Sequence, residues 1–138
     1  MQTMKRFEEI PHTADWSFRA FGSDLKELLE NAAYAMFELE GIHADTNTSE
    51  VVRVVSVYGS DPESLLVNWL SELVYLQETF QEGYYYFLVE LLPRYSLRAQ
   101  IRGQPLTVAV RMIKAVTYHN LTIKQTPAGW ETVVVVDV

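Results

Sequence analysis

The sequence predicts an α+β fold in which two amphipathic helices pack on one face of a mostly antiparallel β-sheet. Two helical patterns fall within the first 83 residues, and strand-like segments occupy most of the remainder. The regular alternation of strands and helices that a parallel nucleotide-binding sheet requires is missing from the sequence. With 138 residues, of which 49% are hydrophobic and 21% charged, we expect a single globular domain over residues 1–138.

The N-terminal part is predicted to contain extended segments followed by one amphipathic helix. Residues 6–22 form two short extended pieces around Pro11, since apolar and polar side chains alternate in the second piece as in a half-buried strand. Ser23 is the candidate N-cap of a helix over residues 24–39, and Gly41 stands where a C-terminal cap glycine is expected. The apolar stripe of this helix consists of Leu25, Leu28, Leu29, Ala32, Ala33, Met36 and Phe37.

The rest of the chain is predicted to hold one more strand, a second helix and then strands only. Residues 51–58 are rich in β-branched side chains, which favours a strand. Asp61 is the expected N-cap of the second helix, with Pro62 at its first position, and the helix should end between Gln81 and Gly83. The later strand candidates cover residues 84–92, 95–103, 106–118, 121–125 and 130–138.

The composition excludes several classes of functional site and indicates the cellular compartment. The absence of cysteine excludes disulfides, thiolate zinc sites, iron–sulfur clusters and a cysteine nucleophile, and it fits a reducing compartment. Eleven basic and 18 acidic residues give a net charge of −7, which counts against a free nucleic-acid binder. Residues 1–83 alone have a net charge of −10. This acidic half either serves solubility or steers the protein toward a basic partner. No secretion signal and no apolar run of roughly 18 residues is found, so we expect a cytoplasmic protein without membrane contact.

Lys114 is the first residue that an ordinary core does not explain. Within the predicted strand 106–118 it shares the more apolar parity with Val110, Met112 and Val116. The Lys114 side chain could extend past the end of the sheet so that its amine reaches solvent, or a β-bulge could move Lys114 to the other face. Alternatively, the ammonium group is held at a functional site beside carboxylates.

Asp137 is the second such residue. It follows the run Val133 to Val136, which is expected to be buried on both faces, and it precedes Val138. The carboxylate is either solvated at a frayed strand end or placed at the lip of the sheet. In the second case the carboxylate of Val138 lies one residue away, and such oxygen-rich sites suit Ca²⁺ or Mg²⁺ rather than zinc.

Sequence signatures of common enzymes are missing. The chain has no glycine-rich phosphate loop, no GxSxG nucleophile elbow and no HExxH helix. The three histidines, His12, His43 and His119, show no metal-ligand spacing among themselves, and each taken alone is more typical of a structural role.

Several motifs together resemble the archease family. The motifs are His12-Thr-Ala-Asp15, Asn68-Trp-Leu-Ser-Glu-Leu-Val-Tyr-Leu76, Ile113-Lys-Ala-Val-Thr-Tyr-His119 and the Val-Asp-Val ending. Their order and approximate spacing match over essentially the whole chain, and their joint occurrence in one small acidic protein is specific. The chain departs from the family pattern directly after Asp15, where Trp16 and Ser17 replace a small or aliphatic pair.

The resemblance implies an activator of the tRNA-splicing RNA ligase. That ligase joins a 2′,3′-cyclic phosphate or 3′-phosphate RNA end to a 5′-hydroxyl end. The resemblance implies that this chain promotes guanylylation and multiple turnover of the ligase and is not itself an enzyme. It also implies a divalent metal, calcium in the first place with Mg²⁺ or Mn²⁺ as alternatives, held by Asp15, Asp137 and Val138.

Further site residues follow from the same resemblance. Lys114 corresponds to a family lysine that is important for ligase activation, and His12 and His119 are candidates to support the metal ligands. If Asp15 and Asp137 share one metal, the strand that holds Asp15 must lie near the C-terminal strand.

Two other classes of function stay open. The first is a general chaperone or adaptor for RNA-modifying enzymes, which acidic helices and exposed aromatic side chains would also serve. The second is a metal-assisted hydrolase using Asp15 and Asp137 with His119 as the general base. For all three classes, the net charge predicts that the protein alone binds RNA weakly, so its partner is expected to be a protein.

Overall fold

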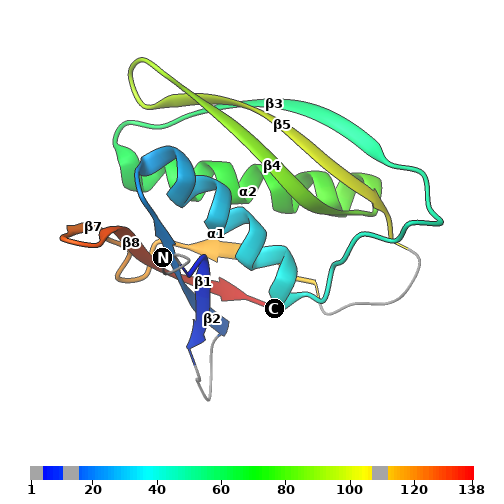
Figure 1. The fold of residues 1–138 in the computed structure, drawn as a ribbon, viewed down its shortest axis with the longest axis horizontal. Helices are drawn as coiled ribbons and strands as arrows, with labels where there is room; N and C mark the ends of the chain where they lie inside the picture. Colours follow the sequence, from blue (N-terminus) through cyan, green and yellow to red (C-terminus); the bar gives the residue numbers. More distant parts are fainter. Residues whose placement is uncertain (1–4, 11–15, 107–111) are drawn as a thin grey trace.

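The computed structural model describes residues 5–10, 16–106 and 112–138, and every strand pair in it is antiparallel. The helices are α1 (Leu25–Leu39) and α2 (Pro62–Phe80). The strands are β1 (Phe7–Ile10), β2 (Trp16–Gly22), β3 (Val51–Tyr58), β4 (Glu82–Leu92), β5 (Ser96–Pro105), β6 (Ala115–Thr117), β7 (Ile123–Thr126) and β8 (Gly129–Asp137). The α+β class and the antiparallel pairing predicted from the sequence are confirmed (Figure 1).

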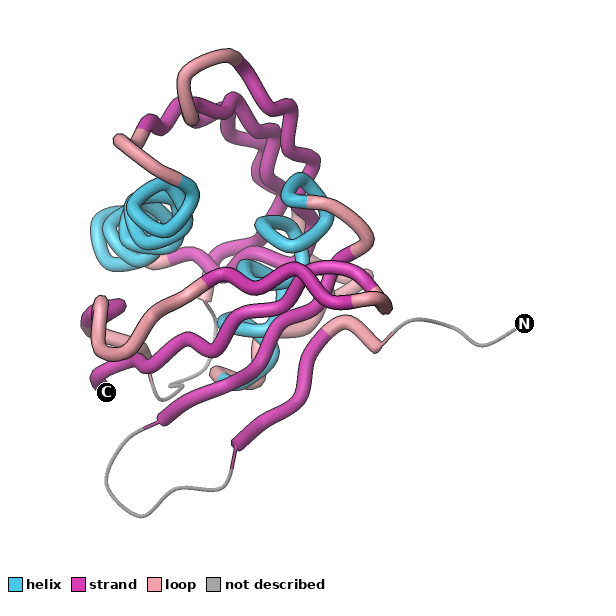
Figure 2. The backbone as a smooth tube through the Cα atoms, turned by 90° about the vertical axis from the view of Figure 1, so that its left-hand side faces the viewer, coloured by secondary structure: helices cyan, strands magenta, loops and turns pink. Residues whose placement is uncertain are grey.

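The strands divide into two sheets, and the helices lie between them (Figures 1 and 2). A three-stranded sheet has the order β3-β5-β4. A five-stranded sheet has the order β1-β2-β8, with β6 and β7 both pairing with the far edge of β8. Helix α1 packs against β2 of one sheet and β4 of the other, and α2 contacts β3, β4 and β6. The helices are therefore covered on two sides, whereas the sequence had suggested packing on one face of one sheet.

One hydrophobic core spans the helices and both sheets. Trp69 of α2 is fully buried at its centre, and its indole Nε1 donates a hydrogen bond to the carbonyl oxygen of Leu29 at 2.9 Å. Phe87 of β4 packs edge-on against Trp69 and stacks on Phe37 of α1. These aromatic contacts tie the helix pair to the three-stranded sheet, since each ring buries a large apolar surface.

The helix ends follow the predicted chemistry with one exception. Asp24, not Ser23, is the N-cap of α1, because the Asp24 carboxylate accepts the backbone N–H of Glu27 at 2.8 Å. The backbone N–H of Ser23 donates to the side chain of Glu27 instead. Gly41 adopts a φ of 84° directly after α1, and its N–H bonds to the carbonyl of Glu38, which confirms its place at the C-terminal end.

The start of α2 is as predicted. Asp61 and Ser64 form a capping box in which each side chain bonds to the backbone of the other residue, and Pro62 occupies the first turn. The helix ends at Phe80, where Gln81 takes a left-handed conformation with φ 54°.

Of the predicted strand over residues 106–118, the described residues confirm only Ala115–Thr117, which form β6. Strand β5 runs to Pro105, residues 107–111 lie outside the described range, and residues 112–114 have no regular structure before β6 begins. The cause is visible at Ile113, whose backbone N–H donates to the side-chain carboxylate of Glu40, the C-cap residue of α1, rather than to a neighbouring strand. The parity that placed Lys114 on an apolar face is therefore lost.

Within the described residues, neither helix has the length and apolar character that crossing a membrane requires.

Candidate functional site

Asp137 and Lys114 meet at one end of the five-stranded sheet. The backbone N–H of Lys114 donates to the carbonyl oxygen of Asp137 at 2.7 Å, and Ala115 pairs with Asp137 in the β6–β8 ladder. Both side chains are exposed, and no ion pair joins them in the described structure. The two residues singled out separately in the sequence thus become neighbours through their backbones.

Strand β8 has one buried face and one half-buried face. Val134 and Val136 are buried toward the helices, whereas Val133 and Val135 are half-buried on the outer face of the sheet. The expectation of burial on both faces is therefore only half right. Because strand side chains alternate, Asp137 belongs to the outer face with Val133 and Val135.

The expected partners of Asp137 on the other side fall partly outside the described chain. Strand β2 pairs with β8 as expected, and Trp16, its first residue, lies opposite Val136. Asp15 and His12 lie outside the described residues, so a site shared by Asp15 and Asp137 stays a prediction. Among the residues that the structure describes, no group of three or more His, Cys, Asp or Glu side chains is arranged to hold a metal.

The segment before Lys114 is held by a buried carboxylate that the sequence did not single out. Glu40, the residue that caps α1, is 5% exposed. Its Oε2 accepts the backbone N–H of Ile113 at 2.6 Å, and its Oε1 accepts the side-chain amide of Gln77 at 2.8 Å. Burial raises the pKa of Glu40, and the hydrogen bonds from Ile113 and Gln77 oppose this rise. Glu40 therefore fixes the backbone position from which Lys114 and its bond to Asp137 extend.

Gln77 is also buried, and its second amide atom is unused. The Oε1 atom of Gln77 has no hydrogen-bond partner in the described structure. In the sequence, Glu40 is an ordinary glutamate immediately before the glycine that follows α1. What the sequence could not supply is the contact with Ile113, which lies 73 positions later.

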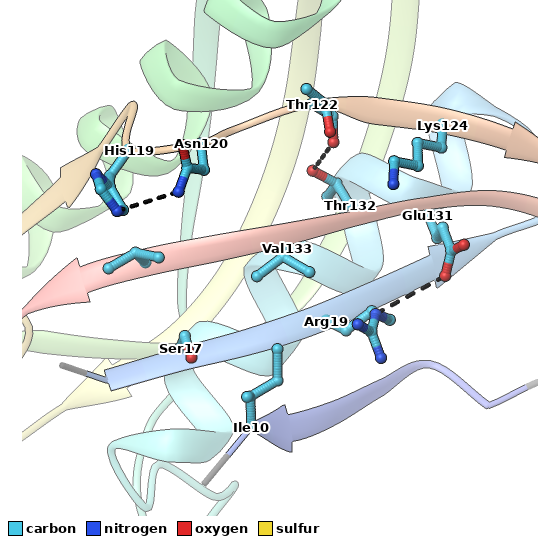
Figure 3. A pocket seen from close by; sticks show the side chains of 11 residues that line it. Ile10, Ser17, Arg19, His119, Asn120, Thr122, Lys124, Glu131, Thr132 and Val133 are labelled. Atoms are coloured by element: carbon cyan, nitrogen blue, oxygen red, sulfur yellow. Dashed lines mark hydrogen bonds and ion pairs between the residues drawn. The ribbon is translucent and has the colours of Figure 1, made fainter. Parts of the chain in front are cut away.

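A pocket of about 620 Å³ lies on the outer face of the five-stranded sheet. Its lining residues are Ile10, Ser17, Arg19, His119, Asn120, Thr122, Lys124, Glu131, Thr132, Val133 and Val135. Figure 3 shows His119 and Asn120 on one side and the ion pair between Arg19 and Glu131 on the other. The pocket arises where β6 and β7 separate along β8, and its mixture of charged, polar and apolar side chains suits a protein surface as readily as a small ligand.

His119 is an exposed wall residue of this pocket. Its ring nitrogen Nε2 lies 3.2 Å from the side-chain amide of Asn120, and its backbone N–H donates to the hydroxyl of Thr117. No carboxylate orients the imidazole in the described part of the chain. This arrangement lacks the base–orienter pair that supports a general base in hydrolysis.

Comparison with known proteins places the whole chain in one group. The model of the archease protein family matches residues 7–138. Protein archease of Methanosarcina acetivorans is 41% identical over 142 residues, covering 97% of each chain. Protein archease of Pyrococcus abyssi is 34% identical over 143 residues, covering 98% of this chain and all of that protein.

Solved structures agree with this similarity. The solution structure of Methanobacterium thermoautotrophicum protein 1598 superposes with a TM-score of 0.76 at 31% identity, covering 98% of this chain and 100% of that one. The crystal structure of an archease from Thermotoga maritima, described as a possible chaperone, has a TM-score of 0.68 at 24% identity and full coverage of both chains, which shows a common fold. With a family match from β1 to the last residue and relatives of 30% identity and more along nearly its full length, the chain belongs to the archease family.

Proposed function

We propose that this chain is a non-catalytic activator of an RNA ligase of the tRNA-splicing type, and that it acts through the sheet end where Lys114 and Asp137 meet. One observation carries the proposal: the hydrogen bond from the Lys114 amide to the Asp137 carbonyl joins the lysine that the family resemblance links to activation with an aspartate that it links to the metal. Family membership supports it, because the expected activity belongs to that family.

The ligand residues that the resemblance implies have the chemistry that a hard divalent cation prefers. Asp137 is exposed, Val138 follows it, and Trp16, the residue after Asp15, pairs with Val136, the residue before Asp137. Asp15, Asp137 and Val138 would supply oxygen ligands only, the type that Ca²⁺ and Mg²⁺ prefer. A bound cation would supply positive charge, which offsets a carboxylate repulsion of about 4 kcal/mol at 4 Å and an effective dielectric of 20. Lys114 would add a second positive charge beside the same group.

The charge distribution supports a protein partner that handles RNA. The first 83 residues carry a net charge of −10, which complements the basic surface that an RNA-handling enzyme presents. The ligase would supply the RNA contacts, and this chain would act on the ligase.

The decisive experiment is ligation of a 3′-phosphate RNA by the cognate ligase under multiple-turnover conditions, with and without this protein. We expect wild type to raise turnover and ligase guanylylation, and Lys114→Ala to lose most of the gain while staying within about 1 kcal/mol of wild-type stability. Lys26→Ala is the matched control, because Lys26 makes only a surface pair with Glu30 on α1. Equal activation by wild type and Lys114→Ala would refute the assigned role.

A general chaperone is the second candidate. The Thermotoga maritima relative is described as a possible chaperone, and this chain exposes large apolar side chains on β3, β4 and α2. Suppression of aggregation of unrelated proteins, unaffected by Lys114→Ala, would favour this function. Turnover of simple phosphoesters by the pure protein would instead favour a metal-assisted hydrolase.

A further inference from the structure

A second surface lies on the other side of the helix layer from Asp137. A groove of about 560 Å³ runs between β3 of the three-stranded sheet and α2. Ser56, Val57 and Tyr58 line it from the strand. Asn68, Ser71, Glu72 and Tyr75 line it from the helix.

The helix side of the groove consists of residues from the 68–76 motif whose side chains do not pack in the core. Within residues 68–76 the apolar side chains other than Tyr75 belong to the core: Trp69, Leu70, Leu73, Val74 and Leu76. Its polar members and Tyr75 point the other way, into the groove, and Tyr75 is 59% exposed. One face of the motif therefore packs in the core, and the opposite face lines the groove.

The strand side of the groove is an open sheet edge. Strand β3 pairs with β5 on one side only. The N–H of Gly59 donates to the carbonyl of Tyr95, so the odd-numbered residues of β3 direct their backbone groups toward β5. The even-numbered residues then direct theirs away from the sheet, and the carbonyl of Tyr58 indeed accepts the side-chain amide of Asn68 of α2 at 2.9 Å.

The outward groups of Val52, Val54 and Ser56 have no partner in the described structure. These groups form an alternating row of donors and acceptors over a strand of eight residues, the pattern that an added strand recognises. Only a polypeptide in extended conformation can match every member of that row.

We propose that this groove binds an extended, cationic segment of a partner protein, which joins the three-stranded sheet as a fourth strand beside β3. Backbone hydrogen bonds to Val52, Val54 and Ser56 give the affinity. A Lys or Arg of the segment pairs with Glu72, which makes no ion pair within the described residues, and its aliphatic stem packs on Tyr58 and Tyr75.

The charges favour a foreign segment over a second copy of this chain. Two copies would each bring a net charge of −7, and their mutual repulsion opposes pairing at this edge. The one basic residue of β3, Arg53, already makes two hydrogen bonds to the carboxylate of Glu82, at 2.7 and 3.0 Å. The proposal concerns a different surface from the sheet end at Asp137, so it does not rest on the proposed activation of a ligase.

The test uses a defined probe, a capped octapeptide of alternating Val and Lys residues, titrated into the ¹⁵N-labelled full chain. We expect chemical-shift changes centred on Val54, Ser56 and Glu72, together with slower amide exchange at Val54 and Ser56. The same peptide N-methylated at every second amide, and a Val–Glu counterpart, should each bind at least about tenfold more weakly.

Protein variants separate the two sources of binding. Glu72→Lys should weaken the probe by about tenfold or more, whereas the matched control Glu78→Lys, exposed on the same helix outside the groove, should change it less than about twofold. Ser56→Pro removes an outward N–H without touching the β3–β5 ladder and should weaken binding similarly. If Ser56→Pro does not fold, the N-methylated peptide still tests the ladder.

Three results would overturn the proposal. They are the absence of binding at millimolar probe, binding that is insensitive to both N-methylation and Glu72→Lys, and a dimer of the protein alone that Ser56→Pro dissociates. The last result would assign the edge to a second copy of this chain.

Discussion

Replacing Glu40 by alanine tests the buried link that fixes the segment before Lys114. The change removes the acceptor of two hydrogen bonds, from the Ile113 backbone at 2.6 Å and from the Gln77 amide at 2.8 Å. Hydrogen bonds to a charged group contribute about 1.5–3 kcal/mol each, so their combined loss is about 3–6 kcal/mol. Relief from burying a carboxylate offsets part of this, and we expect a net loss of about 2–4 kcal/mol in the free energy of unfolding.

Glu40→Gln is the matched control. Its new amide oxygen can accept the Ile113 N–H, and its amide nitrogen can donate to Gln77 Oε1 once the Gln77 amide turns over, because that oxygen is without a partner. Both buried contacts are then retained without charge, and we expect a loss of no more than about 1 kcal/mol. Urea unfolding at pH 7 measures both variants.

The pH dependence of stability gives a second, independent measurement. Burial raises the pKa of Glu40 in the folded protein above its ordinary value of 4.5, so the folded state binds more protons than the unfolded state between the two values. The contribution of Glu40 to stability is therefore greatest at low pH and falls as the pH rises through this window. Glu40→Gln should remove this fall. Equal stability of wild type and Glu40→Ala, or an unchanged pH profile in Glu40→Gln, would refute the reasoning.

Further predictions concern the ion pair, the metal and RNA. Arg53 holds the pKa of Glu82 in the folded protein below its ordinary value. The pair therefore stabilises the fold above about pH 4.5, and this stabilisation is lost as the pH falls through the pKa of Glu82 in the folded protein. Glu82→Gln should lower the free energy of unfolding by about 2–3 kcal/mol at pH 7, measured by urea unfolding, and should reduce the loss of stability at acid pH. Asp15→Asn and Asp137→Asn should each lower Ca²⁺ affinity in calorimetric titration, and the double variant should lose far less than the sum; additive losses would mean separate sites. With a net charge of −7, the protein alone should bind tRNA with a dissociation constant above about 1 μM at 150 mM salt, and tighter binding in a filter assay would contradict this.

The elements predicted with the fewest errors are those whose signals are local. The stripe of α1, the capping residues Asp61 and Pro62 and the glycine after α1 act within a few positions, and the structure places each as expected. The predicted N-cap of α1 was wrong by one residue, because Ser23 and Asp24 are both residue types that cap helices well. Asp24 is the cap because its carboxylate accepts the backbone N–H of Glu27.

The candidate site was predicted unevenly. Lys114 and Asp137 stood out because each breaks an apolar pattern, and their backbones do meet. Glu40 did not stand out, since a glutamate at a helix end is ordinary in sequence and becomes unusual only when Ile113 and Gln77 enclose it.

The sequence by itself determined where both helices and most of the strands form, because side-chain periodicity and capping are properties of neighbouring residues. It also determined the charge and the family. Only the tertiary structure decided how the strands divide into two sheets around the helices, that residues 112–114 leave the strand, and that β3 keeps an open edge beside α2. Periodicity says which face of a strand is buried but not which strand lies beside it, since that choice depends on hydrogen bonds between segments distant in the chain.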